Sequence, residues 1–218
     1  MRRITRTSAL CAAALLAVAG GVTATTASAA PQAQWTVTNP AADDKFTAAP
    51  VSGVTAVLSN VNTGAQLVCT TYAASGTAAD GVRASGAGLA IIQSTTFGTS
   101  TSPCTGPLGS RWTARNNAPM SLNGASYSAG VSKGNITGID ITLTGSSLLG
   151  SCTAKVTGSA NTGSYTNATG VLEVQADATP ALTISGVTGN CAGLLNNGDK
   201  ARYTAKYKVT PVITVTSP

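Results

Sequence analysis

One stretch occurs twice in this chain, and it constrains the fold more than any other feature. The first copy reads C-T-G-P-L from Cys104 and continues as R-W-T-A-R at 111–115. The second reads C-A-G-L-L from Cys191 and continues as R-Y-T-A-K at 202–206. The two halves of the chain therefore share one plan.

A further cysteine lies upstream of each copy at a similar separation, Cys69 before the first and Cys152 before the second. We therefore expect two internal repeats, at about 54–115 and 139–209. Both would belong to one secreted domain that covers residues 30–218.

The first 29 residues are typical of a secretory signal peptide. Arg2, Arg3 and Arg6 open the chain without an acid, a short apolar run follows, and A-S-A ends at Ala29. The apolar run is shorter than the about 20 residues that a membrane-spanning helix needs. We expect cleavage near Ala29 and no transmembrane anchor, with either the general secretory or the twin-arginine route open. Cys11 would be removed with this segment.

The four cysteines that remain are Cys69, Cys104, Cys152 and Cys191. An even number in an exported chain is typical of disulfides. Three pairings are possible, and the repeat favours Cys69–Cys104 and Cys152–Cys191, one in each half. A metal site would need closer ligand spacing such as C-x-x-C, usually with histidine, and the chain has neither. We therefore expect neither a metal nor a cofactor.

Apolar and polar residues alternate along most of the mature chain, as at Ile139, Ile141 and Leu143. A period of two with one polar face predicts antiparallel strands that bury one side. About ten strands are expected, one of them at 67–72, with a loop at 73–88 whose strand content the sequence leaves open. Turns are expected where Asn and Gly cluster, at 60–64, 161–163 and 196–198.

These patterns predict an all-β fold, an antiparallel β-sandwich built from a duplicated disulfide-containing motif. A closed β-barrel is the alternative. Trp112 and Tyr203 occupy equivalent places in the two repeats and are expected in the core beside the disulfides. Trp35 is expected to be the most exposed aromatic residue, and an exposed ring would suit the binding of a sugar.

The net charge of the mature chain indicates which classes of partner it could bind. The whole chain has 13 Lys and Arg against 7 Asp and Glu, and three of the arginines lie in the signal peptide. The small remaining excess is spread thinly and does not predict nucleic-acid binding. Five basic residues would form a stripe for an anionic polymer if their two strands lie side by side, and would otherwise only favour solubility. They are Arg111, Arg115, Arg202, Lys206 and Lys208.

The chain has no histidine, which removes the commonest general base and the usual nucleophile–histidine pairs. A glycosidase needs two carboxylates across a cleft. Glu173 and Asp177 share the parity of one strand face, and Asp140 could lie near them. We interpret all three as solvated outward residues and predict that the chain is not an enzyme.

Two weaker patterns have ordinary explanations. Ser132 and Lys133 are adjacent, so on a strand their side chains point in opposite directions, and the glycine that follows favours a turn. Asp43 and Asp44 alone supply too few oxygen ligands for calcium.

The segments L-L-G-S-C-T-A-K-V-T-G at 148–158 and Y-T-A-K-Y-K-V-T-P at 203–211, with the cysteine layout, resemble a set of actinobacterial secreted proteins. Most of that set is uncharacterised, and some members resemble proteins labelled as protein activators of alkane oxidation. The resemblance covers about residues 54–211. It implies an exported, non-enzymatic, disulfide-bearing β domain and transfers no catalytic residue.

Three functions are compatible with these features. The first is a non-catalytic secreted protein, extracellular or associated with the cell surface, whose partner is an envelope component or an extracellular polymer. The second is a binding module for a polysaccharide or a hydrophobic small molecule, marked by an exposed aromatic row or an apolar cavity. The third is a histidine-free hydrolase, marked by two carboxylates about 5–10 Å apart.

Overall fold

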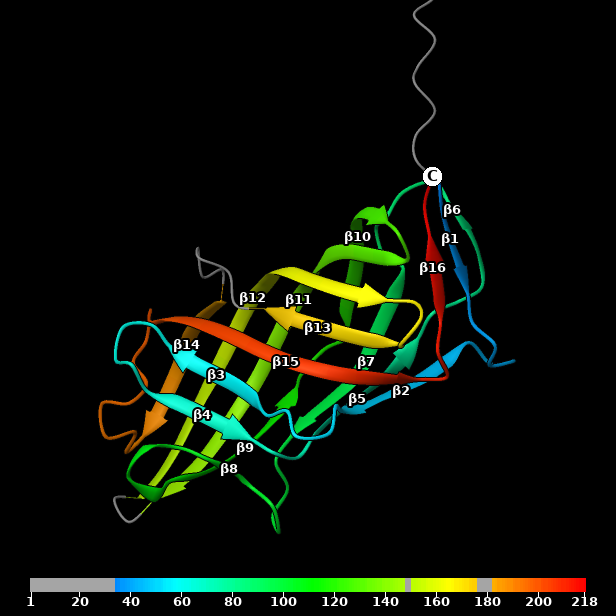
Figure 1. The fold of residues 1–218 in the computed structure, drawn as a ribbon. Coiled ribbons are helices and arrows are strands. Elements are labelled where there is room, and N and C mark those ends of the chain that lie inside the picture. Colours follow the sequence, from blue (N-terminus) through cyan, green and yellow to red (C-terminus); the bar gives the residue numbers. More distant parts are fainter. Residues whose placement is uncertain (1–33, 148–149, 176–181) are drawn as a thin grey trace, which may run out of the picture. The chain divides into compact units, whose positions relative to one another are not determined.

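Strands form wherever the alternation of apolar and polar residues persists, and they fill most of the chain in Figure 1. The computed structural model describes residues 34–147, 150–175 and 182–218. The predicted signal peptide, with Arg2, Arg3, Arg6, Cys11 and the cleavage site at Ala29, lies outside these residues. Within them, the only helical element is the 3₁₀ turn Pro107–Gly109, and it is far too short to span a bilayer.

Thirteen strands form one large antiparallel sheet, and three short strands form a second. The large sheet contains β2 (Lys45–Pro50), β3 (Ala56–Asn60), β4 (Gln66–Cys69), β5 (Tyr72–Thr77), β7 (Ala90–Phe97), β8 (Cys104–Thr105), β9 (Arg111–Asn116), β10 (Met120–Ser128), β11 (Val131–Ser147), β12 (Gly150–Thr166), β13 (Val171–Gln175), β14 (Leu182–Gly189) and β15 (Lys200–Thr210). The small sheet has the order β16 (Thr214–Thr216), β1 (Trp35–Thr38) and β6 (Gly81–Arg83). The predicted all-β, antiparallel class is confirmed.

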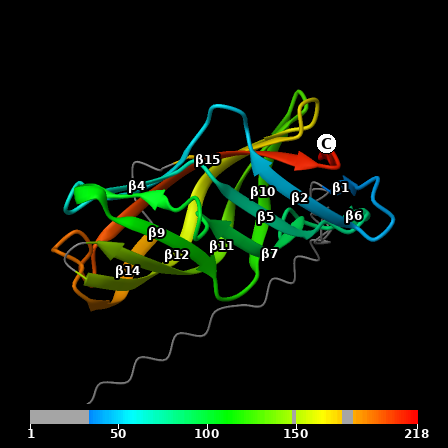
Figure 2. The same cartoon turned by 90° about the horizontal axis from the view of Figure 1, so that it is seen from below.

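The large sheet folds over on itself, so its inner face encloses one apolar core as in a sandwich (Figures 1 and 2). Near the disulfides, successive pairings run β3–β4–β8–β9–β11–β12–β14–β15 and return to β3. Further along the strands, they run β15–β2–β5–β7–β10–β11–β12–β13 and return to β15. Because the strands change partners along their length, the fold is not the clean barrel of the alternative prediction.

The two repeats interlock. Strand β9 of the first repeat pairs with β11 of the second, and β15 of the second pairs with β3 of the first. The hairpin β3–β4 of the first repeat is thus equivalent to the hairpin that β11 and β12 form in the second repeat, from Ile139 onward. Both predicted disulfides are present, Cys69–Cys104 and Cys152–Cys191. The expected duplicated motif is therefore built into one sheet.

Two predicted local features are wrong. The expected single strand 67–72 is broken after Cys69, because β4 pairs with β3 and β8 whereas β5 pairs with β2 and β7. The expected loop 73–88 contains most of β5 and all of β6. The strands of the described residues therefore number more than the ten expected.

Of the three turns predicted from Asn and Gly residues, two coincide with a glycine of positive φ and one does not exist. Gly64 and Gly198 are the last residues of the turns predicted at 60–64 and 196–198, and they have φ of 75° and 91°, which only glycine adopts without strain. The turn predicted at 161–163 is wrong, since this segment lies inside β12 and Gly163 pairs with both Gly134 and Val174. A Cβ at Gly163 would come within 3.1 Å of a backbone oxygen, so this glycine permits close strand packing.

The prediction that Trp35 is exposed is also wrong. Its side chain is only 4% exposed, and β1 pairs with both β6 and β16. A Cβ at Gly124 would lie 2.6 Å from the Trp35 ring, so the missing side chain of β10 makes the space that the ring fills. The first aromatic residue of the chain therefore belongs to the core.

Candidate functional site

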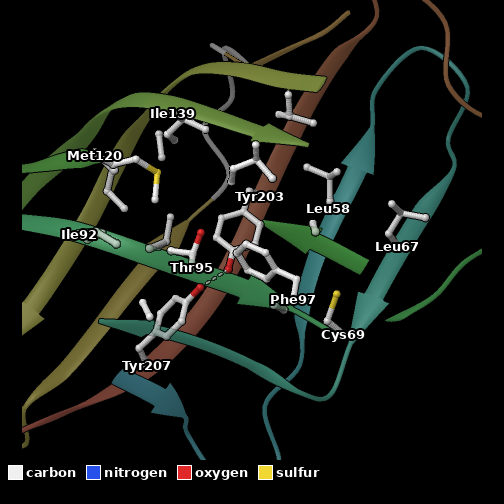
Figure 3. A pocket seen from close by; sticks show the side chains of 18 of the residues that line it. Leu58, Leu67, Cys69, Ile92, Thr95, Phe97, Met120, Ile139, Tyr203 and Tyr207 are labelled. Carbon is white, nitrogen blue, oxygen red and sulfur yellow. Dashed lines mark hydrogen bonds between the residues drawn. The ribbon is translucent and has the colours of Figure 1, made fainter. Parts of the chain in front are cut away.

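An apolar cavity of about 80 Å³ lies inside the folded sheet, between strands of both repeats. Figure 3 shows Ile92 and Phe97 of β7 around it, with Met120, Ile139 and Tyr203 from three other strands. Several inward positions carry only alanine. They are Ala48, Ala56, Ala74, Ala114 and Ala160. Because only 4% of the chain is aromatic and these inward side chains are small, the interior stays incompletely filled.

Thr95 provides a hydrogen-bonding group in this apolar wall. The residue is 4% exposed, and its Oγ1 has no hydrogen-bond partner in the structure. A buried hydroxyl without a partner costs about 1–3 kcal/mol. Figure 3 shows this hydroxyl turned toward the same part of the cavity as the hydroxyls of Tyr203 and Tyr207. The site therefore has an unused hydrogen-bonding group inside an apolar space.

The two tyrosines complete a small hydroxyl cluster on β15. The Tyr203 and Tyr207 hydroxyl oxygens lie 2.6 Å apart. The Tyr203 ring packs edge-on against Phe97 with centroids 5.5 Å apart, and the Tyr207 ring packs against Tyr72 at 5.0 Å. These ring contacts hold the pair in place, since aromatic edge-to-face pairs are mutually stabilising.

Both phenols stay neutral at physiological pH. Burial raises the pKa of Tyr203 well above its ordinary value, and the neighbouring Tyr207 raises it further. Burial likewise raises the pKa of Tyr207, although the hydrogen bond with Tyr203 partly offsets the effect. Neutral phenols both donate and accept hydrogen bonds, so the cluster can meet either kind of polar group.

The lining residues indicate which ligands fit. No charged side chain lines this cavity among the described residues, so an ionised ligand would lose its hydration without a compensating partner. The volume is about half that of an engineered apolar cavity of about 150 Å³ that binds benzene. The cavity therefore suits a few apolar heavy atoms with one neutral hydrogen-bonding group.

The predicted core positions are largely confirmed. Trp112 is 3% exposed, lies opposite Cys104 and donates from Nε1 to Ser110 Oγ at 2.8 Å. Tyr203 is partly buried, as expected for its equivalent strand, but it pairs with Leu58 and lines the cavity. Both aromatic residues therefore line the cavity, and Trp112 also lies at the Cys69–Cys104 disulfide through its pairing with Cys104.

The basic residues do not form the predicted stripe. Strand β9, with Arg111 and Arg115, pairs with β7, β8 and β11, whereas β15 pairs with β2, β3, β13 and β14. On β15, Lys206 forms an ion pair of 3.0 Å with Glu173, while Lys208 is exposed. The condition for the stripe, two strands side by side, is not met.

The candidate carboxylates are also separated. Asp140 of β11 and Glu173 of β13 lie on opposite sides of β12, where they pair with Thr157 and Ser164. These two partners are seven residues apart along the strand, which is roughly 20 Å. Asp177, the third candidate, lies outside the described residues. The distance between Asp140 and Glu173 does not suit glycoside hydrolysis.

The two weaker patterns have structural roles. Ser132 is buried and Lys133 is exposed, so they face opposite sides, although the predicted turn after them is wrong because Gly134 lies within β11. The Asp43 carboxylate pairs with Lys45 at 2.8 Å, and Asp44 accepts a hydrogen bond from the backbone. In the part of the chain that the structure describes, no three acids or cysteines form a metal-binding group.

Sequence reasoning missed Thr95 because a β-bulge changes which residues face inward. The pairing of β7 with β5 shifts between Ser75 and Gly76, which skips Gln93. Both Ile92 and Thr95 are therefore buried, although strict alternation would place them on opposite faces. A threonine in a β-branched run gives no other signal of this position.

Comparisons of the chain with protein-family models, with curated proteins and with solved structures found no match. The resemblance to actinobacterial secreted proteins therefore stays a prediction. What the cavity can bind must follow from its own residues.

Proposed function

We propose that this protein is a secreted, non-catalytic binding protein that holds a neutral apolar molecule inside the folded sheet. The observation that carries the proposal is Thr95 Oγ1, a buried hydroxyl without a partner in an otherwise apolar cavity. A ligand with one neutral hydrogen-bonding group would satisfy this hydroxyl and fill the space that the alanines leave.

Export is part of the proposal. Two disulfides fit a protein of an oxidising compartment, because intracellular thiols are kept reduced in most organisms. The binding role is supported over an exposed sugar platform by the burial of Trp35, Trp112 and Tyr207.

Calorimetric titration with butanol tests the proposal, since butanol has few heavy atoms and one hydroxyl. We expect one butanol bound per protein. Thr95→Val keeps the shape of the side chain and removes its hydroxyl, so it should weaken butanol about fivefold, the effect of one net hydrogen bond of about 1 kcal/mol. Thr96→Val, on the opposite face of the same strand, is the matched control and should leave the affinity unchanged. The absence of saturable butanol binding to the wild type would refute the proposal.

A further inference from the structure

A second apolar cavity, of about 100 Å³, lies beside the small sheet. Val37 of β1 and Val215 of β16 contribute to its wall. Ser132 also lines it, is 7% exposed, and has an Oγ without a hydrogen-bond partner. This cavity therefore shares with the first one unused buried hydroxyl, although its mainly apolar lining also includes Asn123, Lys133 and Asn135.

The two cavities share part of their lining. Four apolar residues, Phe46, Ile136, Leu172 and Val174, belong to the walls of both. Their side chains are thus what separates the cavities. A molecule that occupied both cavities would therefore have to displace one of these four side chains.

The two unused hydroxyls lie on opposite sides of this shared wall. Ser132 precedes Ile136 on β11 by four residues, about 13 Å of strand. On the other side, Thr96 is level with Thr142 of β11, because both lie opposite Arg115 of β9. Along the direction of β11, Ile136 therefore lies between the level of Ser132 and the level of Thr95.

We propose that the two cavities are one elongated site for a single unbranched aliphatic molecule. Its neutral polar end would lie at Thr95, and its chain would pass Phe46 toward Ser132. An aliphatic chain fits this path because both cavities are lined mainly by apolar residues and share four of them. The hydroxyl of Ser132 would then meet a second polar group on a longer ligand. This inference rests on the proposed function, since it extends the ligand already placed at Thr95.

A series of butanol, hexanol and octanol, titrated calorimetrically into the full mature protein, tests the inference. Each methylene that becomes buried should tighten binding about fourfold, so affinity should rise from butanol to octanol at one molecule per protein. Affinity that stops rising beyond butanol, or two octanol molecules per protein, would overturn the single elongated site and leave the proposed function intact. No binding of any of the three would overturn both.

Two variants test where the aliphatic chain of the ligand lies. Ser132→Leu fills the second cavity and removes its unused hydroxyl, so it should weaken octanol more than tenfold and leave butanol unchanged. Phe46→Ala removes the ring, one of the four side chains of the shared wall, so it should tighten octanol relative to butanol. Equal effects on both alcohols in both variants would contradict a chain that crosses the wall. The far-ultraviolet circular dichroism of each variant checks that the fold is retained.

Discussion

Thr95 is the residue on which the proposed ligand binding depends most. Without a ligand its buried hydroxyl has lost its hydrogen bonds to water and gained none in return. Thr95→Val should therefore raise the free energy of unfolding of the ligand-free protein by about 1 kcal/mol. Urea denaturation measures this change. A fall in stability, like that of an ordinary threonine with a partner, would show that the hydroxyl is satisfied.

The buried phenols predict a dependence of stability on alkaline pH. The pKa values of Tyr203 and Tyr207 are raised above the ordinary value of about 10 in the folded state. Above pH 10 the unfolded chain therefore releases protons that the folded protein retains, so stability is complete below pH 10 and falls as the pH rises further.

Urea denaturation between pH 7 and pH 11 measures this fall. The double variant Tyr203→Phe, Tyr207→Phe removes both groups and should lose less stability over the alkaline part of the range than the wild type does. Identical slopes in the two proteins would contradict the pKa shifts of this pair.

For single residues, the disulfide pairing could be predicted from the sequence, whereas the burial of side chains that depends on tertiary contacts could not. The pairing of Cys69 with Cys104 followed from an even cysteine count and the repeat, and it is confirmed. The inward position of Thr95 depends on a bulge, and the burial of Trp35 depends on the space at Gly124. Neither feature can be predicted from the residues that neighbour Thr95 or Trp35 in the sequence.

At the scale of elements, one strand contact is close enough to exclude a methyl group. Gly145 of β11 pairs with Trp112 of β9, and a Cβ at Gly145 would lie 2.5 Å from the indole ring. Gly145→Ala should therefore lower the free energy of unfolding by about 1–3 kcal/mol, because the ring must shift in a packed core.

Thermal denaturation compares this variant with Ser146→Ala, the exposed neighbour on the same strand. The control should change stability by less than about 0.5 kcal/mol. If Gly145→Ala behaves like the control, the indole does not pack on this strand as described.

Strand alternation predicted the class of the elements and failed at their ends. Buried Ile139 and Leu143, with Ile141 partly buried between them, match the expected inward parity of β11. The extent of β12 could not be predicted, since the glycine at 163 that suggested a turn instead allows close strand packing. Turn residues and packing residues are the same amino acids, and only the neighbouring strand distinguishes them.

For the whole molecule, the interlocked repeats imply that neither half is a folding unit. Asn60 of the first half donates to the buried Asp199 carboxylate of the second at 2.6 Å, in addition to the pairing of β3 with β15. Burial opposes ionisation of Asp199, but hydrogen bonds from Asn60 and Asn196 outweigh it and lower its pKa. The connection between the halves is thus both a strand pair and a charged hydrogen-bond network.

Separate fragments 54–115 and 139–209 should therefore fail to fold, although each keeps its own disulfide. Each would expose strand edges that pair with the other half in the intact chain, and such edges favour aggregation. Amide spectra of the isolated fragments should lack the dispersion of a folded protein. A dispersed spectrum from either fragment alone as a monomer would contradict the interlocked arrangement.

Methyl-resolved NMR during a butanol titration would show whether a neutral apolar ligand enters the interior of the sheet. Saturable shifts at the methyl groups of Ile92, Met120 and Ile139, which line the first cavity, are the predicted result. Shifts confined to the exposed Val82 and Val212, or no saturable shift at all, would contradict it.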